Sequence, residues 1–175
     1  MNVEHESKIS IRGDLRIVTR DSSSFDILDV FEKKNVITFL ATETLVKLMA
    51  PNAVFGATVQ QESQIKSMRF GTSSVTPQRT DTNLAAEVAP ARKELLDGNR
   101  LVGAAGTVEF TATLGAADGN GFTFREAGLF TRGNADDPLV TVPNPTSMFS
   151  RQVYPDQVKT AAITLEYRWR ITFTV

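Results

Sequence analysis

The sequence predicts a mainly β fold, an antiparallel β-sandwich of jelly-roll-like form with one covering α-helix near residues 37–49. Three observations favour this fold: several segments alternate apolar and polar residues, glycine-rich turns separate them, and one stretch has helical spacing. The clearest alternation is AAITLEYRWRITFTV, residues 161–175, where every odd position is apolar and every even position after Ala162 is polar. Period two is typical of a strand with one buried face and one solvent-facing face.

This closing strand is unusually long. At roughly 3.3 Å per residue it would span about 50 Å. We expect it to pair with a strand predicted at 107–114 or with one at 148–154, and to supply Tyr167, Trp169 and Phe173 to the core. Because a long unpaired edge is an aggregation hazard, we also expect a neighbouring copy of the chain to cover it.

The N-terminal residues 1–12 are polar and predict an arm, whereas residues 13–175 predict a single β-sandwich domain. Residues 13–21 alternate and predict a strand, and residues 25–38 predict a second one with a weaker pattern. The DSSS stretch that joins them is typical of a turn, because short polar side chains bond their own backbone. The two strands therefore predict a hairpin.

In one stretch the apolar residues recur with the spacing of an α-helix. In ITFLATETLVKLM, residues 37–49, apolar or small residues recur on one helical face: Ile37, Leu40, Ala41, Thr44, Leu45, Leu48 and Met49. Pro51 follows and helps to end the helix. This stripe predicts a helix that covers the sheet, and no cofactor is expected.

Loops and short elements fill the middle of the chain. Residues 51–63 predict a loop, 64–71 a short strand, and 72–84 a loop rich in Ser, Thr and Pro. Residues 84–100 predict a short helix or turn around ARKELLDGN, because Pro90 interrupts any longer helix.

The second half of the chain has the strongest β pattern, and the whole sequence predicts about seven to nine strands. The Asp-Gly and Asn-Gly pairs of AADGNG are typical of a hairpin connection, since they accept positive φ. The elements predicted before the closing strand are a strand at 106–115, the turn at 116–121, a strand at 122–130, a turn at 131–138, and short strands at 139–142 and 148–154.

Composition disfavours several classes of function. The chain has no cysteine and one histidine, His5, so catalysis or zinc binding through these residues is disfavoured. The formal net charge of −1 argues against nucleic acid as a partner. No run of about 18 apolar residues and no basic-then-apolar leader is present, so we expect neither a transmembrane helix nor a signal peptide.

Short motifs give no catalytic, cofactor-binding or metal-ligating residues. The RGD tripeptide at residues 12–14 leads into a strand, and chance explains it. The DGNG stretch at 118–121 resembles part of a calcium loop but lacks the downstream Glu, so a hairpin turn is favoured.

Charged residues on the predicted strands have an ordinary explanation. Arg125 and Glu126, like Glu166, Arg168 and Arg170, predict cross-strand ion pairs on a solvent-facing surface. In YRWR the aromatic residues and the arginines fall on opposite faces, which argues against a platform for stacking nucleic-acid bases.

Four segments follow one another in a particular order. They are EKKNVITFLATETLVKLM (32–49), MRFGTSSVTPQRTDTNLAAEV (68–88), FREAGLF (124–130) and MFSRQVYPDQVKTAAITLEYRWRITF (148–173). In this order they resemble small structural proteins encoded in the tail and neck gene clusters of tailed bacteriophages. The resemblance covers roughly residues 25–175. The polar N-terminus and the GTSS stretch, where a second glycine would be usual, depart from the pattern.

The resemblance implies a non-enzymatic virion structural protein of the tail, baseplate, collar or fibre-attachment apparatus, assembled in the host cytoplasm. We expect its partners to be other copies of itself, in a ring or trimer, and neighbouring virion proteins. Residues 71–106 and the N-terminal arm are the expected contacts; no membrane, nucleic acid or small-molecule substrate is expected.

Two alternatives remain open at this point. One is a capsid decoration (cement) protein. The other is a carbohydrate-binding β-sandwich module, for which one Trp and two Tyr are a thin supply of aromatic side chains.

Overall fold

A computed structural model describes residues 10–49, 63–95, 100–103, 106–131 and 147–174. These ranges contain nine strands, one α-helix and one short 3-10 helix. The strands are β1 Ser10–Asp21, β2 Ile27–Ile37, β3 Ile65–Gly71, β4 Lys93–Glu94, β5 Arg100–Gly103, β6 Thr107–Leu114, β7 Thr123–Thr131, β8 Met148–Val158 and β9 Ile163–Thr174. The helix α1 is Phe39–Met49, and the 3-10 helix is Ala89–Ala91.

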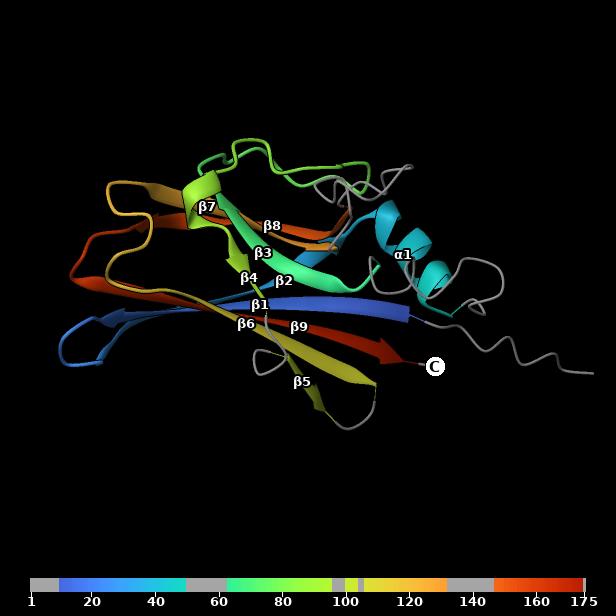
Figure 1. Ribbon diagram of the computed structural model, residues 1–175, viewed down its shortest axis with the longest axis horizontal. Coiled ribbons are helices and arrows are strands. Elements are labelled where there is room, and N and C mark those ends of the chain that lie inside the picture. Colours follow the sequence, from blue (N-terminus) through green and yellow to red (C-terminus); the bar gives the residue numbers. More distant parts are fainter. Residues whose placement is uncertain (1–9, 50–62, 96–99, 104–105, 132–146, 175) are drawn as a thin grey trace, which may run out of the picture.

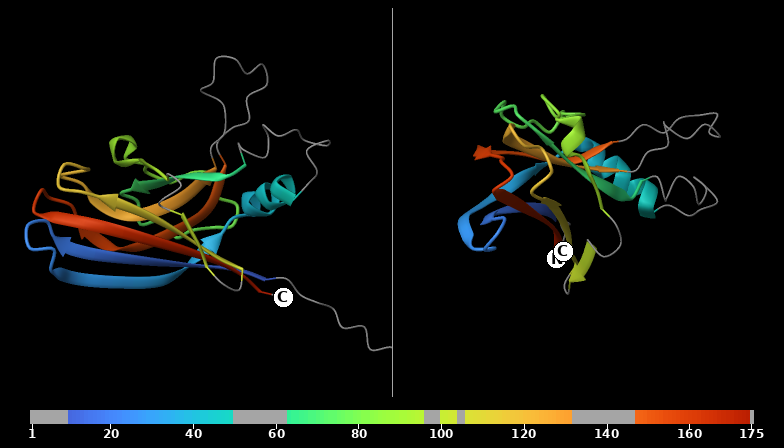
Figure 2. Two further views of the ribbon diagram at one scale, coloured as in Figure 1. Left: turned by 60° about the horizontal axis from the view of Figure 1, so that its bottom comes forward. Right: turned by 60° about the vertical axis from the view of Figure 1, so that its left-hand side comes forward.

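The nine strands form one antiparallel sheet in the order β4-β3-β7-β8-β2-β1-β9-β6-β5, which curls into a half-barrel (Figures 1 and 2). β2 pairs with β8 only through Val36↔Arg151 and Ile37↔Ser150. We call β5-β6-β9-β1-β2 the first wing and β4-β3-β7-β8 the second wing. The mainly β, antiparallel fold is confirmed, but a division into the two sheets of a jelly-roll-like sandwich is not established, because β2 joins both wings.

The closing strand β9 lies inside the sheet and not at an edge. It pairs with β1 from Ile163 to Thr174 and with β6 from Leu165 to Thr172. The predicted pairing with residues 107–114 is therefore confirmed. The expectation that a neighbouring copy covers β9 is wrong, because β1 occupies that position within the same chain.

The side chains of β9 separate onto two faces as the alternation predicts. The residues of β9 that are fully buried are Leu165, Tyr167, Trp169 and Ile171. Across the curl, the rings of Phe70 and Tyr167 lie 4.5 Å apart between centroids, and the Tyr154 and Tyr167 hydroxyls lie 3.2 Å apart. Because Phe70 and Tyr154 belong to the second wing, these contacts hold the two wings around one core.

The helix α1 confirms the predicted helix near residues 37–49. Thr38 precedes it, and its hydroxyl donates to the Met148 carbonyl over 2.5 Å. Ala41 and Thr44 are buried and Leu45 is partly buried. The helix packs against β8 and covers one end of the sheet only (Figure 2).

The structure differs from the sequence prediction in three places because of tertiary pairing. Residues 10–12, predicted as part of the arm, belong to β1, because Ser10 and Ile11 pair with the end of β9. The short helix or turn predicted around residues 91–99 is replaced by strand β4 after the 3-10 helix ends at Ala91, and the buried Leu95 donates its amide to the Lys66 carbonyl over 2.7 Å. β5 is a four-residue strand that the sequence pattern does not predict.

The strand predicted at 148–154 continues through Pro155 to Val158 as β8. Pro155 is tolerated because β8 has a partner strand on one side only there, and because the β7–β8 register shifts between Phe124 and Glu126. The strand predicted at 139–142, most of the loop predicted at 51–63, and His5 lie outside the described residues.

The turn between β1 and β2 is built on Asp21. Its Oδ1 accepts hydrogen bonds from the Ser23 hydroxyl at 2.5 Å, the Ser23 amide at 2.8 Å and the Ser24 amide at 2.9 Å. These bonds, with that of the Ser23 hydroxyl the largest, lower the pKa of Asp21 to about 2. The turn chemistry predicted for DSSS is confirmed.

Neighbouring positions of β9 should respond differently to truncation. Leu165→Ala removes a fully buried side chain and should lower the free energy of unfolding by about 2–5 kcal/mol. Thr164→Ala, on the opposite face, should change it by less than about 1 kcal/mol. Denaturant unfolding followed by Trp169 fluorescence measures both, and equal losses would contradict the assignment of faces.

The Asp21 turn should respond to pH. Because the folded pKa of about 2 lies below the ordinary 3.8, ionised Asp21 stabilises the fold above about pH 4 and this contribution is lost as the pH falls towards 2. Ser23→Ala should raise the pKa of Asp21 towards its ordinary value. Ser22→Ala should leave the pKa of Asp21 unchanged, because the Ser22 hydroxyl donates to the Ala161 carbonyl and not to Asp21. NMR titration of the Asp21 carboxyl distinguishes the two results.

Candidate functional site

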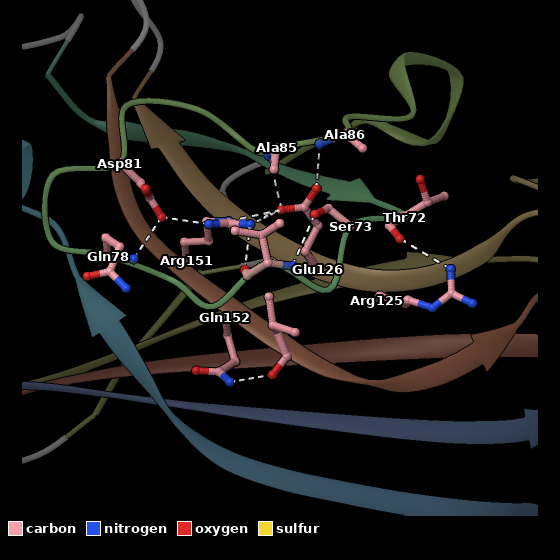
Figure 3. A network of polar contacts seen from close by, with 12 residues as sticks. Thr72, Ser73, Gln78, Asp81, Ala85, Ala86, Arg125, Glu126, Arg151 and Gln152 are labelled. Atoms are coloured by element: carbon pink, nitrogen blue, oxygen red, sulfur yellow. Dashed lines mark hydrogen bonds and ion pairs between the residues drawn. The ribbon is translucent and has the colours of Figure 1, made fainter.

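A buried ionic network joins β7, β8 and the segment 72–88 (Figure 3). Glu126 on β7 is 0% exposed and Arg151 on β8 is 1% exposed. The Arg151 Nη2 and Nε atoms lie 2.7 and 2.9 Å from Glu126 Oε2. On its other side, Arg151 Nη1 lies 2.6 Å from Asp81 Oδ2, so the guanidinium lies between two carboxylates.

The two faces of β7 explain why these charges are buried. Ala127 and Leu129 face the main core. On the alternate face, Phe130 packs in a second cluster with Leu84 and Met148, and Leu84 belongs to the segment 72–88. This segment covers the outer face of the second wing, so a side chain that would otherwise reach solvent lies beneath it (Figure 1).

Backbone groups of the segment complete the network. The Ala85 and Ala86 amides donate to the two Glu126 carboxylate oxygens, over 3.1 and 2.7 Å. Arg151 Nη2 also donates to the Val75 carbonyl over 3.1 Å. A Cβ atom at position 71 would collide with both the Ala86 carbonyl and Glu126 Oε1, so Gly71 is required for this close approach.

Both charged groups have several hydrogen-bond partners. The Glu126 carboxylate accepts from two nitrogens of Arg151 and two backbone amides, and the guanidinium donates to two carboxylates and one carbonyl. Because its oxygens already accept four hydrogen bonds, Glu126 is poorly arranged for proton transfer. The network instead fixes the segment 72–88 to the sheet and leaves Ser74, Val75 and Thr76 exposed.

The RGD tripeptide lies within β1, where Arg12 and Asp14 pair with each other at 2.8 Å. A Cβ atom at position 13 would collide with the Asn35 side chain, so the glycine is needed for strand packing. This arrangement favours the explanation by chance over a recognition loop.

The DGNG stretch forms the predicted turn. Asp118 Oδ1 pairs with Lys93 at 2.7 Å, and Asn120 Oδ1 accepts from Lys159 Nζ at 3.0 Å. Partial burial raises the pKa of Asp118, but hydrogen bonds from Lys93 and the Gly115 amide outweigh it, and the net pKa is lowered. Lysine ammonium groups thus take the positions that a cation would need, and the described residues contain no group of three or more possible metal-ligating side chains.

The outer face of the first wing carries ion pairs. Arg170 pairs across strands with Glu109 at 3.0 Å, as predicted, whereas Arg168 pairs with Glu166 at 2.5 Å within β9 itself. Together with charged residues of β1 and β2, Glu109, Arg168 and Arg170 line an open depression of about 470 Å³. The aromatic residues of YRWR point to the core, so this face offers no stacking platform.

The sequence interpretation missed the network. It placed Glu126 on a solvent-facing surface, and it gave no role to Arg151 or Asp81. A signal was available: Glu126 directly precedes the apolar run AGLF, and Arg151 follows MFS, so each charge stands beside a mainly apolar run. Charges in such positions require a buried partner.

The chain matches no protein-family model, and no curated protein or solved structure gives a significant match. In the part of the chain that the structure describes, no helix has the length and apolar character needed to cross a membrane.

Breaking the ionic network should destabilise the fold. Glu126→Gln keeps the size of the side chain but leaves Arg151 with Asp81 as its one charged partner, and should lower the free energy of unfolding by about 3–5 kcal/mol. Limited proteolysis should also cut the variant faster within residues 72–88. Denaturant unfolding and peptide mapping measure these effects.

Asp156→Asn is the matched control. It breaks the Arg125–Asp156 pair, whose 2.7 Å contact lies at the surface with side chains 33% and 60% exposed. The loss should be below about 1 kcal/mol. Similar losses in the two variants would show that the buried pair has no special role.

Proposed function

We propose that this chain is a non-enzymatic structural subunit of a tailed bacteriophage particle, in the tail, baseplate, collar or fibre-attachment apparatus. It acts by assembling with copies of itself and with neighbouring virion proteins. In the finer form of this proposal, the two wings behave as the layers of a jelly-roll-like sandwich, since they enclose one core.

One observation carries the proposal. Three of the segments on which the resemblance rests contribute to the same network: Asp81 from TDT, Glu126 from EAGLF and Arg151 from MFSR. These short stretches are far apart in sequence, and none of them alone is specific for the phage structural proteins. Their contact gives a physical reason for their occurring together, because the buried Arg151 charge is balanced by the carboxylates of Glu126 and Asp81.

The network also suggests how the subunit would bind its neighbours. A segment fixed by buried ionic contacts presents its exposed residues in one conformation, which reduces the entropy lost on docking. Val75, with 61% of its surface exposed, lies on the outward side of this segment. We propose residues 72–88 as a contact with another virion protein.

The alternative of a carbohydrate-binding module has less support. Trp169, Tyr154 and Tyr167 are all buried, with 0–4% of their surfaces exposed. Platforms that stack sugars require exposed aromatic rings. A glycan array probed with the full chain would detect such binding, and specific glycan capture would favour the alternative.

Labelling of particles tests the proposal. Antibodies against the recombinant full chain should label the tail or neck of phage particles from a host strain that encodes it, as seen by electron microscopy. Label over the head would favour the cement-protein alternative. If mass spectrometry of purified particles finds no peptide of this chain, the virion role is contradicted.

A further inference from the structure

We infer that the outer edge of β2 is a self-association surface, where β2 of a second copy pairs antiparallel about a two-fold axis. The inference rests on the proposed self-assembly and assigns it a partner, a strand and a register. It replaces the expectation that β9 supplies the unpaired edge.

β2 has a partner strand on one side over most of its length. β1 pairs with β2 between Ile27 and Asn35, whereas β8 reaches only Val36 and Ile37. No described strand occupies the other side of residues 27–35. In the left view of Figure 2, β2 runs along the lower border of the sheet. Its outward backbone groups are thus available to another strand.

The same edge exposes apolar side chains. Ile27, Leu28 and Val30 are 54%, 57% and 41% exposed. A neighbouring strand would cover backbone and apolar groups together, which is the usual mode of strand addition. The edge strands at the ends of the sheet are much shorter, with two residues in β4 and four in β5.

The charges along β2 identify the second strand as another β2. In ILDVFEKKN the acids precede the bases: Asp29 and Glu32 come first, then Lys33 and Lys34. Antiparallel pairing centred on Phe31 places Asp29 of each copy opposite Lys33 of the other. Residues 29, 31 and 33 share one face of the strand, so these opposite charges are direct cross-strand neighbours.

Other arrangements are less favourable. Parallel pairing in register places Asp29 opposite Asp29. A shift of the antiparallel register by one residue places Asp29 opposite Glu32 in one direction and opposite Lys34 in the other. Either shift puts the inner face of one copy beside the outer face of the other. Asp29 and Lys33 are exposed, and neither forms an ion pair with another described residue. A lysine at a strand edge disfavours pairing with a strand that has no acidic residue opposite it. The charge pattern of β2 therefore favours a second β2 over other strands.

Charge reversal with the full chain tests the inference. The native chain should be dimeric in sedimentation-velocity and light-scattering measurements. Asp29→Lys and Lys33→Asp should each raise the dimer dissociation constant by at least about tenfold, because like charges then face each other. The double variant Asp29→Lys/Lys33→Asp restores opposite charges and should recover dimerisation.

Glu94→Lys provides the matched control, because it makes the same charge change on the edge strand β4 and should leave the dimer unaffected. Circular dichroism and thermal unfolding establish that each variant is folded. A native chain that stays monomeric at millimolar concentration overturns the inference, as does a double variant that fails to dimerise. Self-association that no β2 variant weakens also overturns it. The proposed virion function is judged separately by particle labelling, so the two failures are distinguishable.

Discussion

The ion pair between Glu126 and Arg151 is the contact on which the second wing depends. Two opposite charges with almost no exposed surface stabilise a fold only when their remaining hydrogen-bonding groups are satisfied. Here the segment 72–88 satisfies them with two amides, one carbonyl and Asp81. The pair therefore needs the segment, and the segment is held by the pair. Leu84 packs with Phe130 on the covered face of β7, and the missing side chain of Gly71 leaves room for the Ala86 carbonyl beside Glu126.

The sequence predicts those features that depend on neighbouring residues. The alternation in β9, the turn at Asp21 and the period of α1 are local patterns, and each is confirmed. Strand partners are not local: period two assigns two faces to β9 but does not say that β1 lies beside it. The short helix or turn predicted around 91–99 gives way to β4 for the same reason, since backbone pairing with β3, including the bond from Leu95 to Lys66, outweighs local propensity.

The ionic network of the candidate site could not be predicted from local sequence patterns, for a related reason. Glu126 and Arg125 are adjacent on β7, at a shift in its register with β8, but their surroundings differ. Arg125 pairs with Asp156 at the surface, while Glu126 lies beneath a segment that begins more than 40 residues earlier in the chain. The pattern of β7 alone does not reveal that this segment folds back over it. The apolar residues that follow Glu126 are consistent with burial on both faces, but they do not identify the guanidinium that balances its charge.

The pairing of β1 with β9 affects how the chain reaches its folded state. Ser10 contacts Thr174, 164 positions away in sequence, so the first wing closes only after the last strand has been synthesised. At the usual 5–20 residues per second, β1 would wait roughly 7–30 s on the ribosome for this partner. Its apolar face has to be shielded during that interval, by the hairpin with β2 or by chaperones. Closure of the first wing thus waits for β9, and production of the chain should depend on the rate of translation and on the folding capacity of the cell.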